Sequence, residues 1–150
     1  MCEDKTVKGW YLEFRYDTRG FGMLRLHQDH LIPLEYAART GSIDRQLYLV
    51  HSIPFGVWTI TEPPVDTDEV AMTIEPGLGW KVRMLTPEGL WSRYLIHPDG
   101  NRPGTAGCIG IQGESALDLK QRIAEILNAQ KEIPVYVNTP IPEDGIYAQA

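Results

Sequence analysis

Short runs of strand-forming residues, separated by turn residues at close intervals, recur through most of this chain. Aromatic and β-branched side chains favour strands, and glycine, proline, aspartate and asparagine favour the turns between them. Many short strands at such spacing are typical of a β-sandwich or a small barrel. The strands predicted on this basis are residues 9–16, 23–26, 46–50, 57–60, 70–74, 80–85, 94–97 and 108–111.

One amphipathic helix is predicted from Ser115 to about Asn128. Ser115, followed three residues later by Asp118, forms a capping-box pattern. A single helical face then collects the apolar side chains, and we expect it to pack on the sheet. The fold class predicted is therefore mainly β, a sandwich or barrel with one main helix. The apolar positions of the helix are Ala116, Leu119, Ile123, Ile126 and Leu127.

Length and charge narrow the class of protein. A chain of 150 residues with 43% hydrophobic content suits one domain, residues 1–150, with a surface tail from about residue 140. The net charge of −6 argues against nucleic acid as a partner, because phosphate binding needs a basic surface. No apolar run is long enough to cross a bilayer, and the first residues lack the apolar segment of a secretory signal peptide.

His97 and Cys108 lie at the two ends of a connector rich in glycine and proline. The strand before His97 delivers the imidazole to one rim, and the strand from Cys108 to Ile111 carries the sulfur back along the other. A neighbouring imidazole is the usual means of turning a thiol into a nucleophilic thiolate. The arrangement predicts a Cys/His catalytic site whose sulfur is anionic at neutral pH.

Each member of this pair also has a simpler interpretation. An isolated cysteine is often only a small buried side chain, and a loop histidine often makes an ordinary hydrogen bond. As a base, His97 needs a third group on its other ring nitrogen, either Asp99 or a backbone carbonyl just after the histidine. Gly107 allows a close backbone approach, and the N–H groups of Gly107 and Cys108 are candidates for stabilising an oxyanion.

The stretch from Thr105 to Ile109, with His97 upstream, resembles the catalytic motif of the L,D-transpeptidase (YkuD-type) family. In that family a histidine at a strand end precedes a glycine-bearing loop and then Ser/Thr-His-Gly-Cys. Residues 37–41 resemble its Thr-Gly segment, residues 54–58 its turn before a strand, and residues 132–137 its closing strand. The likeness runs over most of the chain, and only the stretch from His97 to Cys108 is specific.

The resemblance implies a single L,D-transpeptidase-like catalytic domain that transfers acyl groups of peptidoglycan stem peptides through a thioester on Cys108. It implies no metal and no organic cofactor. Stem peptides carry carboxylates, so Arg93 and Arg102 are candidates for substrate binding, with Thr105 and Asp99 beside them. Solvated surface charge is the simpler interpretation for both arginines, and shaping of the turn is the simpler one for Thr105.

Two positions depart from the family pattern. Ala106 stands where the family usually has a histidine, and Gly110 where it often has an arginine. The short separation of His97 and Cys108 is more similar to secreted antibacterial effectors or phage-borne relatives. Crosslinking, D-amino-acid exchange and L,D-carboxypeptidase hydrolysis all stay open as the reaction.

The same branch implies where the protein acts and with what. Without a signal peptide, we expect synthesis in the cytoplasm and action in the periplasm or cell wall, after secretion by a dedicated machine or after lysis. The partners expected are the peptidoglycan stem peptide and, for an effector, an immunity protein or secretion machinery. We expect a monomer and no membrane partner.

Rival hypotheses use the same residues differently. A peptidoglycan-binding or phage structural module would keep the fold without the chemistry. An N-terminal nucleophile hydrolase would use Cys2 after removal of Met1.

His27 and His30 suggest a metal site only weakly, because no cysteine or third histidine is near. His51 follows a predicted strand near the cleft rim, and an ordinary structural histidine is the favoured interpretation there. Of the four tryptophans, Trp91 is the best candidate for contacting a sugar.

Overall fold

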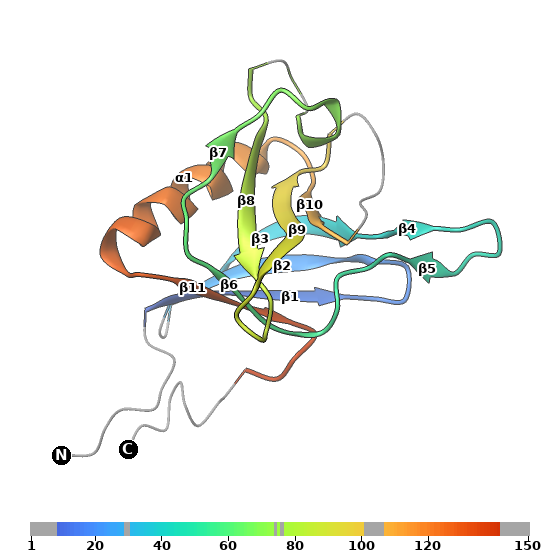
Figure 1. The fold of residues 1–150 in the computed structure, drawn as a ribbon, viewed down its shortest axis with the longest axis horizontal. Helices are drawn as coiled ribbons and strands as arrows, with labels where there is room; N and C mark the ends of the chain where they lie inside the picture. Colours follow the sequence, from blue (N-terminus) through green and yellow to red (C-terminus); the bar gives the residue numbers. More distant parts are fainter. Residues whose placement is uncertain (1–8, 29–30, 74, 76, 101–106, 142–150) are drawn as a thin grey trace.

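The computed structural model describes residues 9–28, 31–73, 75, 77–100 and 107–141. The molecule is mainly β, with 45% strand and 15% helix, and forms a closed barrel of eight strands with one helix packed against it (Figure 1). The predicted fold class is confirmed. Of the helices in these ranges, none has the length and apolar character needed to span a membrane.

The strands are short, as their turn-rich surroundings require. They alternate buried and exposed side chains, the pattern of a sheet that faces a core on one side. In chain order they are β1 (Trp10–Tyr16), β2 (Phe21–Gln28), β3 (Leu34–Thr40), β4 (Ser42–Ile43), β5 (Leu49–Val50), β6 (Gly56–Ile60), β7 (Val65–Asp66), β8 (Trp80–Leu85), β9 (Trp91–Pro98), β10 (Ile109–Ile111) and β11 (Ile133–Val137).

The main sheet closes on itself. Its order is β6-β11-β1-β2-β3-β10-β9-β8-β7, and a pairing between β6 and β8 joins the two sides, with β7 as an extra edge strand. Most neighbours are antiparallel, but β1 pairs with β11 and β9 pairs with β10 in parallel. Closure leaves eight strands without a free edge, which removes a common route to aggregation.

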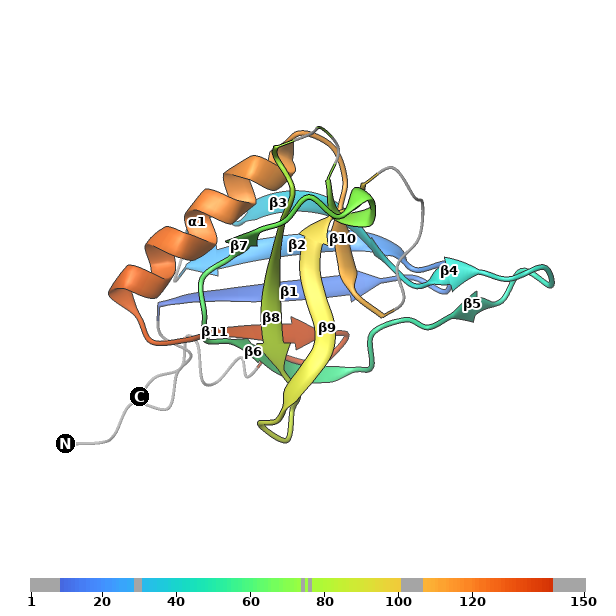
Figure 2. The same ribbon diagram turned by 45° about the horizontal axis from the view of Figure 1, so that its top comes forward.

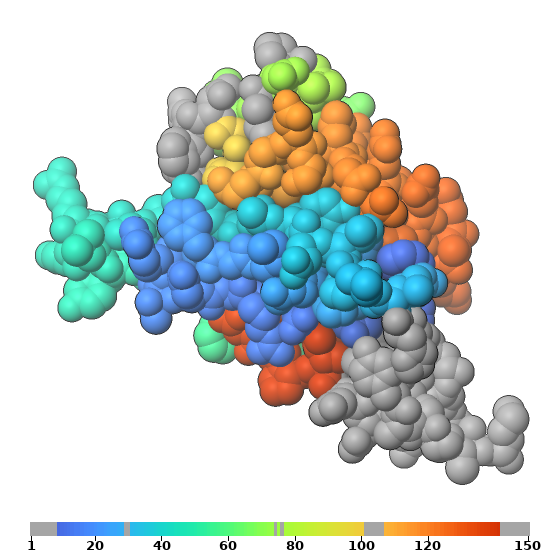
Figure 3. All heavy atoms as spheres, turned by 180° about the vertical axis from the view of Figure 1, so that it is seen from behind, coloured from blue at the N-terminus to red at the C-terminus, as the bar shows by residue number. Residues whose placement is uncertain are grey.

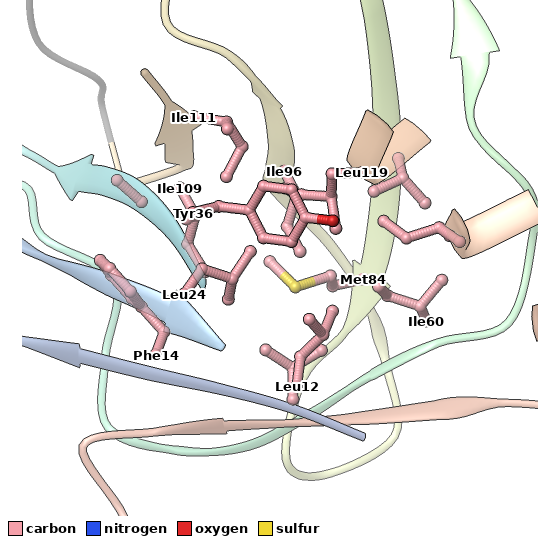
Figure 4. Close-up of a cluster of buried hydrophobic side chains, with 14 of the residues drawn as sticks. Leu12, Phe14, Leu24, Tyr36, Ile60, Met84, Ile96, Ile109, Ile111 and Leu119 are labelled. Atoms are coloured by element: carbon pink, nitrogen blue, oxygen red, sulfur yellow. The ribbon is translucent and has the colours of Figure 1, made fainter. Parts of the chain in front are cut away.

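The barrel interior is filled by one cluster of buried side chains. Leu12, Leu24, Met84 and Ile96 come from four different strands and have no solvent-accessible surface. Figure 4 shows them converging on a common centre together with Leu119 from the helix. At roughly 25 cal/mol per Å² of apolar surface removed from water, this interior supplies the main stabilisation of the fold.

Helix α1 (Ser115–Ala129) lies alongside β7 and β3 (Figures 1 and 2). Its buried face consists of Ala116, Leu119, Ile123 and Ile126, as predicted, and Leu127 is partly buried against it. The predicted capping box is wrong. Asp118 instead accepts hydrogen bonds from the Tyr36 hydroxyl at 2.5 Å and from Arg122 Nε at 2.8 Å. This carboxylate therefore fastens the helix to β3 rather than capping its first turn.

Strands β4 and β5 form a separate hairpin that projects from the barrel (Figures 2 and 3). A continuous strand predicted over residues 46–50 is therefore wrong. The Asp44 carboxylate accepts hydrogen bonds from the backbone N–H groups of Gln46 and Tyr48, and Leu47 has a left-handed φ of 68°. These features turn the chain at residues 44–48 and leave only Leu49 and Val50 extended.

One further predicted strand is wrong, and one strand of the barrel was not predicted. Within the predicted strand 70–74, Val70–Met72 is instead the 3-10 helix η1, closed by a hydrogen bond from Met72 N to Glu69 O. Strand β3 was not predicted, because Glu35 and Arg39 face solvent or other polar groups and weaken its apolar pattern. The backbone partners β2 and β10 hold it extended.

Candidate active site

Parallel pairing of β9 and β10 brings His97 and Cys108 to the same side of the sheet. Ile96 lies opposite Ile109, and both side chains point into the barrel core. Successive side chains of a strand point to opposite faces, so His97, which follows Ile96, points to the outer face of the sheet. Cys108 directly precedes Ile109, so the same alternation directs its side chain to that outer face. A backbone hydrogen bond from Leu95 to the sulfur agrees with this register. The strand at Cys108 thus runs parallel to β9, not back along it as predicted.

A pocket of about 430 Å³ opens beside the cysteine. The nucleophile candidate therefore has room for a ligand next to it, although its side chain is largely buried at 9% exposure. Strand β9 supplies one wall, and η1 and the segment after β5 contribute to the rest. The residues that line the pocket are His51, Met72, Arg93, Tyr94, Leu95 and Cys108.

His97 is held in one ring orientation and one tautomer. It is 3% exposed, and its Nδ1 lies 2.6 Å from the carbonyl oxygen of Pro98. A carbonyl can only accept a hydrogen bond, so Nδ1 carries the proton and Nε2 keeps the lone pair that a base needs. Burial lowers the pKa of His97, opposed in part by the Pro98 carbonyl and by the charges of Asp99 and Glu69. The imidazole is therefore neutral at pH 7.

Cys108 is not anionic in the resting site. Burial raises the pKa of the Cys108 thiol above its ordinary value, although the Leu95 hydrogen bond and the charge of Arg93 act in the opposite direction. The sequence-based expectation of a thiolate at neutral pH is therefore not met. The resting pair is a thiol and a neutral imidazole, so any deprotonation has to accompany attack on a bound substrate.

Asp99 does not orient the imidazole, because the Pro98 carbonyl takes that position. Its carboxylate is 5% exposed, accepts a hydrogen bond from Gln112 Nε2 at 2.7 Å and lies 3.7 Å from Arg39 Nε. The other oxygen, Oδ1, is buried and has no hydrogen-bond partner among the described residues. Neither Asp99 nor His97 is among the described residues that line the pocket. The contacts of Asp99 tie the end of β9 to the segment after β10 and to β3.

Gly107 has a structural reason to be glycine. Its φ is +90°, in the left-handed region, and an added Cβ would overlap the Tyr94 ring. Tyr94 itself packs edge-on against Trp58, with ring centroids 5.1 Å apart. The close approach of ring and backbone therefore positions the chain immediately before Cys108.

Of the remaining candidates for substrate binding, Arg93 lies within the described residues, and Arg102 and Thr105 do not. Arg93 lines the pocket, with its guanidinium carbon 6.0 Å from the centroid of the Tyr94 ring. Arg102 and Thr105, together with Ala106, lie outside the described residues. His51 lines the pocket as well, which fits its expected position near the cleft rim, and its role there stays a prediction. Its backbone has a left-handed φ of 59°.

The remaining polar and aromatic candidates lie elsewhere. His27 Nε2 is 2.9 Å from Glu13 Oε1, and its ring stacks on Tyr11, so it belongs to a surface network on β1 and β2. His30 is outside the described residues, and within the described part of the chain no group of three metal-ligating side chains gathers. Trp91 is half exposed and lies 4.0 Å beneath the Arg83 guanidinium, away from the lining of the Cys108 pocket.

Acid is expected to weaken the folded state through His97. Because burial holds its pKa below the ordinary 6.5, the unfolded chain takes up this proton before the folded chain does. The free energy of unfolding should therefore fall as the pH drops below about 6.5, by at most about 1.4 kcal/mol per pH unit. Urea unfolding between pH 7 and pH 5 measures this slope.

The control for this prediction is His97→Gln, which should flatten the dependence between pH 7 and pH 5. The pKa values of Glu13 and Asp118 are lowered from 4.5 and 3.8, so their contributions are lost only at more acidic pH. The same slope in the variant and in the wild type would show that His97 is not the group responsible.

Comparisons of the chain with protein-family models, with curated proteins and with solved structures found no match. The function is therefore argued from the geometry of the site and from the sequence resemblance.

Proposed function

We propose that this protein is a cysteine-dependent acyl transferase or hydrolase acting on peptidoglycan stem peptides. The observation that carries the proposal is the open pocket lined by Cys108, with His97 on the neighbouring strand β9 keeping a base nitrogen at Nε2. The substrate class comes from the resemblance to L,D-transpeptidases. The site of action is then the cell wall, reached by secretion or lysis.

The first half-reaction forms a thioester. His97 Nε2 takes the proton from the Cys108 thiol while the sulfur bonds to the carbonyl carbon of the scissile peptide bond. The carbon–nitrogen bond breaks, and the leaving amine, the terminal D-alanine, departs with the proton from the imidazolium. The neutral starting pair suits this concerted transfer, because neither a buried thiolate nor a buried imidazolium has to persist in the resting enzyme.

The second half-reaction resolves the thioester. An amine gives a crosslink, a D-amino acid gives exchange, and water gives L,D-carboxypeptidase hydrolysis. In each case the carbon–sulfur bond breaks and the sulfur regains the proton that the acceptor lost. Arg93 would bind a carboxylate of the stem peptide, since a guanidinium in the pocket wall matches a carboxylate in charge and geometry.

The test is direct detection of the covalent intermediate. The full-length protein is mixed with a disaccharide-tetrapeptide, quenched in acid after short times, and its intact mass and peptide map are recorded. We expect a mass increase equal to the acyl fragment without D-alanine, located on Cys108 and released by hydroxylamine. D-Alanine release with no adduct, or an adduct on another residue, would reject the assignment of Cys108.

A second candidate is a binding module on the same barrel with no catalysis. The observation in its favour is the burial of Cys108, which raises the thiol pKa in the manner of a structural cysteine. Iodoacetamide alkylation followed from pH 6 to pH 10 separates the two. An inert thiol stays slow until the pH passes its raised pKa. A nucleophile that has formed the thioester is protected from alkylation until hydroxylamine releases it, and a binding module shows no recovery that depends on hydroxylamine.

A further inference from the structure

His51, just after β5, lines the Cys108 pocket. Its backbone is in the left-handed region at φ 59°, which histidine, asparagine and aspartate adopt more often than other side chains.

Contacts on both sides of His51 impose that conformation. Val50 pairs with Ser42 across the β4–β5 hairpin, and a Cβ at Gly41 would meet the Val50 carbonyl. Two residues after His51, Ile53 is fully buried, and its N–H donates to Thr40 Oγ1 at 2.9 Å. The Tyr16 hydroxyl donates to the Ile53 carbonyl at 2.7 Å. The imidazole is thus held at the pocket by an anchored chain.

Resolution of the thioester requires that a proton be taken from the incoming acceptor, and His97 is poorly placed to take it. His97 is buried, directs one ring nitrogen to the Pro98 carbonyl, and is not among the described residues that line the pocket. An acceptor approaches the thioester from the open side of the pocket. Among the described lining residues, the charged or titratable groups are Arg93, Tyr94, Cys108 and His51. Of these, imidazole is the side chain suited to exchange protons near neutral pH.

We propose that His51 is a second catalytic residue that takes the proton from the incoming acceptor during resolution of the Cys108 thioester. As the acceptor nitrogen or water oxygen bonds to the carbonyl carbon, its proton passes to the His51 imidazole. The carbon–sulfur bond breaks, and the departing thiolate recovers that proton. This inference rests on the proposed acyl transfer and assigns its second half-reaction.

The test measures the two half-reactions separately with a disaccharide-tetrapeptide as donor and glycine as acceptor. The burst of D-alanine reports thioester formation, and decay of the Cys108 adduct reports its resolution. His51→Gly is the main variant, because glycine adopts a positive φ without strain. We expect resolution to slow by roughly 10- to 100-fold, the lower part of the range for a positioned acid–base group. Added imidazole should restore much of it.

Two controls separate chemistry from structure. His51→Asn tolerates the same backbone conformation but cannot exchange the proton, so it should resolve the adduct as slowly as His51→Gly. Leu47→Gly alters another left-handed residue of the hairpin, outside the described pocket lining, and should leave both half-reactions unchanged. Unchanged resolution in both His51 variants, or slowing that imidazole does not restore in His51→Gly, would overturn the role of His51. Absence of any Cys108 adduct in the wild type would instead overturn the proposed function and this inference with it.

Discussion

Replacing Cys108 by alanine is expected to abolish D-alanine release from a disaccharide-tetrapeptide. Without the sulfur no thioester can form, and loss of a catalytic nucleophile costs on the order of 10³- to 10⁶-fold in turnover. The substitution removes one atom from a side chain at the wall of an open pocket, so the fold should survive. Mass spectrometry of the released D-alanine under single-turnover conditions measures the effect.

A matched variant shows whether the effect belongs to the cysteine. Met72 lines the same pocket and also carries sulfur, so Met72→Leu alters the same wall without touching the proposed chemistry. We expect Met72→Leu to change turnover only a fewfold and circular dichroism to be the same in both variants. D-Alanine release at the wild-type rate by Cys108→Ala would eliminate the acyl-enzyme mechanism.

Replacing Gly107 by alanine is expected to destabilise the fold strongly. The left-handed φ of +90° costs an alanine roughly 1–2 kcal/mol, and overlap with the Tyr94 ring adds roughly 1–3 kcal/mol. Together these costs reach at most the lower end of the total stability of an ordinary domain, about 5–15 kcal/mol. Urea unfolding followed by tryptophan fluorescence measures the loss.

Gly89 provides the control for backbone strain. It has nearly the same φ, +85°, but a Cβ there would meet no atom within 4 Å. Gly89→Ala should therefore show the cost of the backbone alone, and the difference from Gly107→Ala isolates the contact with Tyr94. In a double-mutant cycle, Gly107→Ala should cost less stability in a Tyr94→Ala background than in the wild type. Equal losses at Gly107 and Gly89 would mean that the Tyr94 ring does not determine the glycine.

Local patterns predicted much of the architecture. The alternation of Lys81 and Arg83 with apolar neighbours placed β8, and the spacing of Leu119, Ile123 and Ile126 placed the buried face of α1. The predicted capping box failed because its carboxylate has a distant partner. Asp118 binds Tyr36, 82 positions away, and so leaves the helix start without the expected cap. A capping pattern is local, whereas that hydrogen bond depends on the closure of the barrel.

For the candidate site, too, some features are expected from the sequence and others come only from the structure. Residue types and spacing predict the pair His97 and Cys108, because a nucleophile needs a base nearby, and its catalytic role stays a prediction. The orienting carbonyl of Pro98 was one of two alternatives, and the structure has the carbonyl rather than Asp99. The parallel pairing of β9 and β10 was not predicted, whereas the place of His51 in the pocket lining fits its expected position near the cleft rim.

The amino-acid order alone was enough to establish a mainly β domain with one amphipathic helix and to single out the thiol and the imidazole, since strand, helix and turn preferences act over a few neighbouring residues. Burial and long-range contacts set the rest: a raised pKa of the Cys108 thiol, a lowered pKa of the His97 imidazole, a glycine dictated by the Tyr94 ring, and the place of His51 in the lining of the Cys108 pocket. Desolvation and packing depend on groups far apart in the chain, so these properties exist only once the barrel has closed.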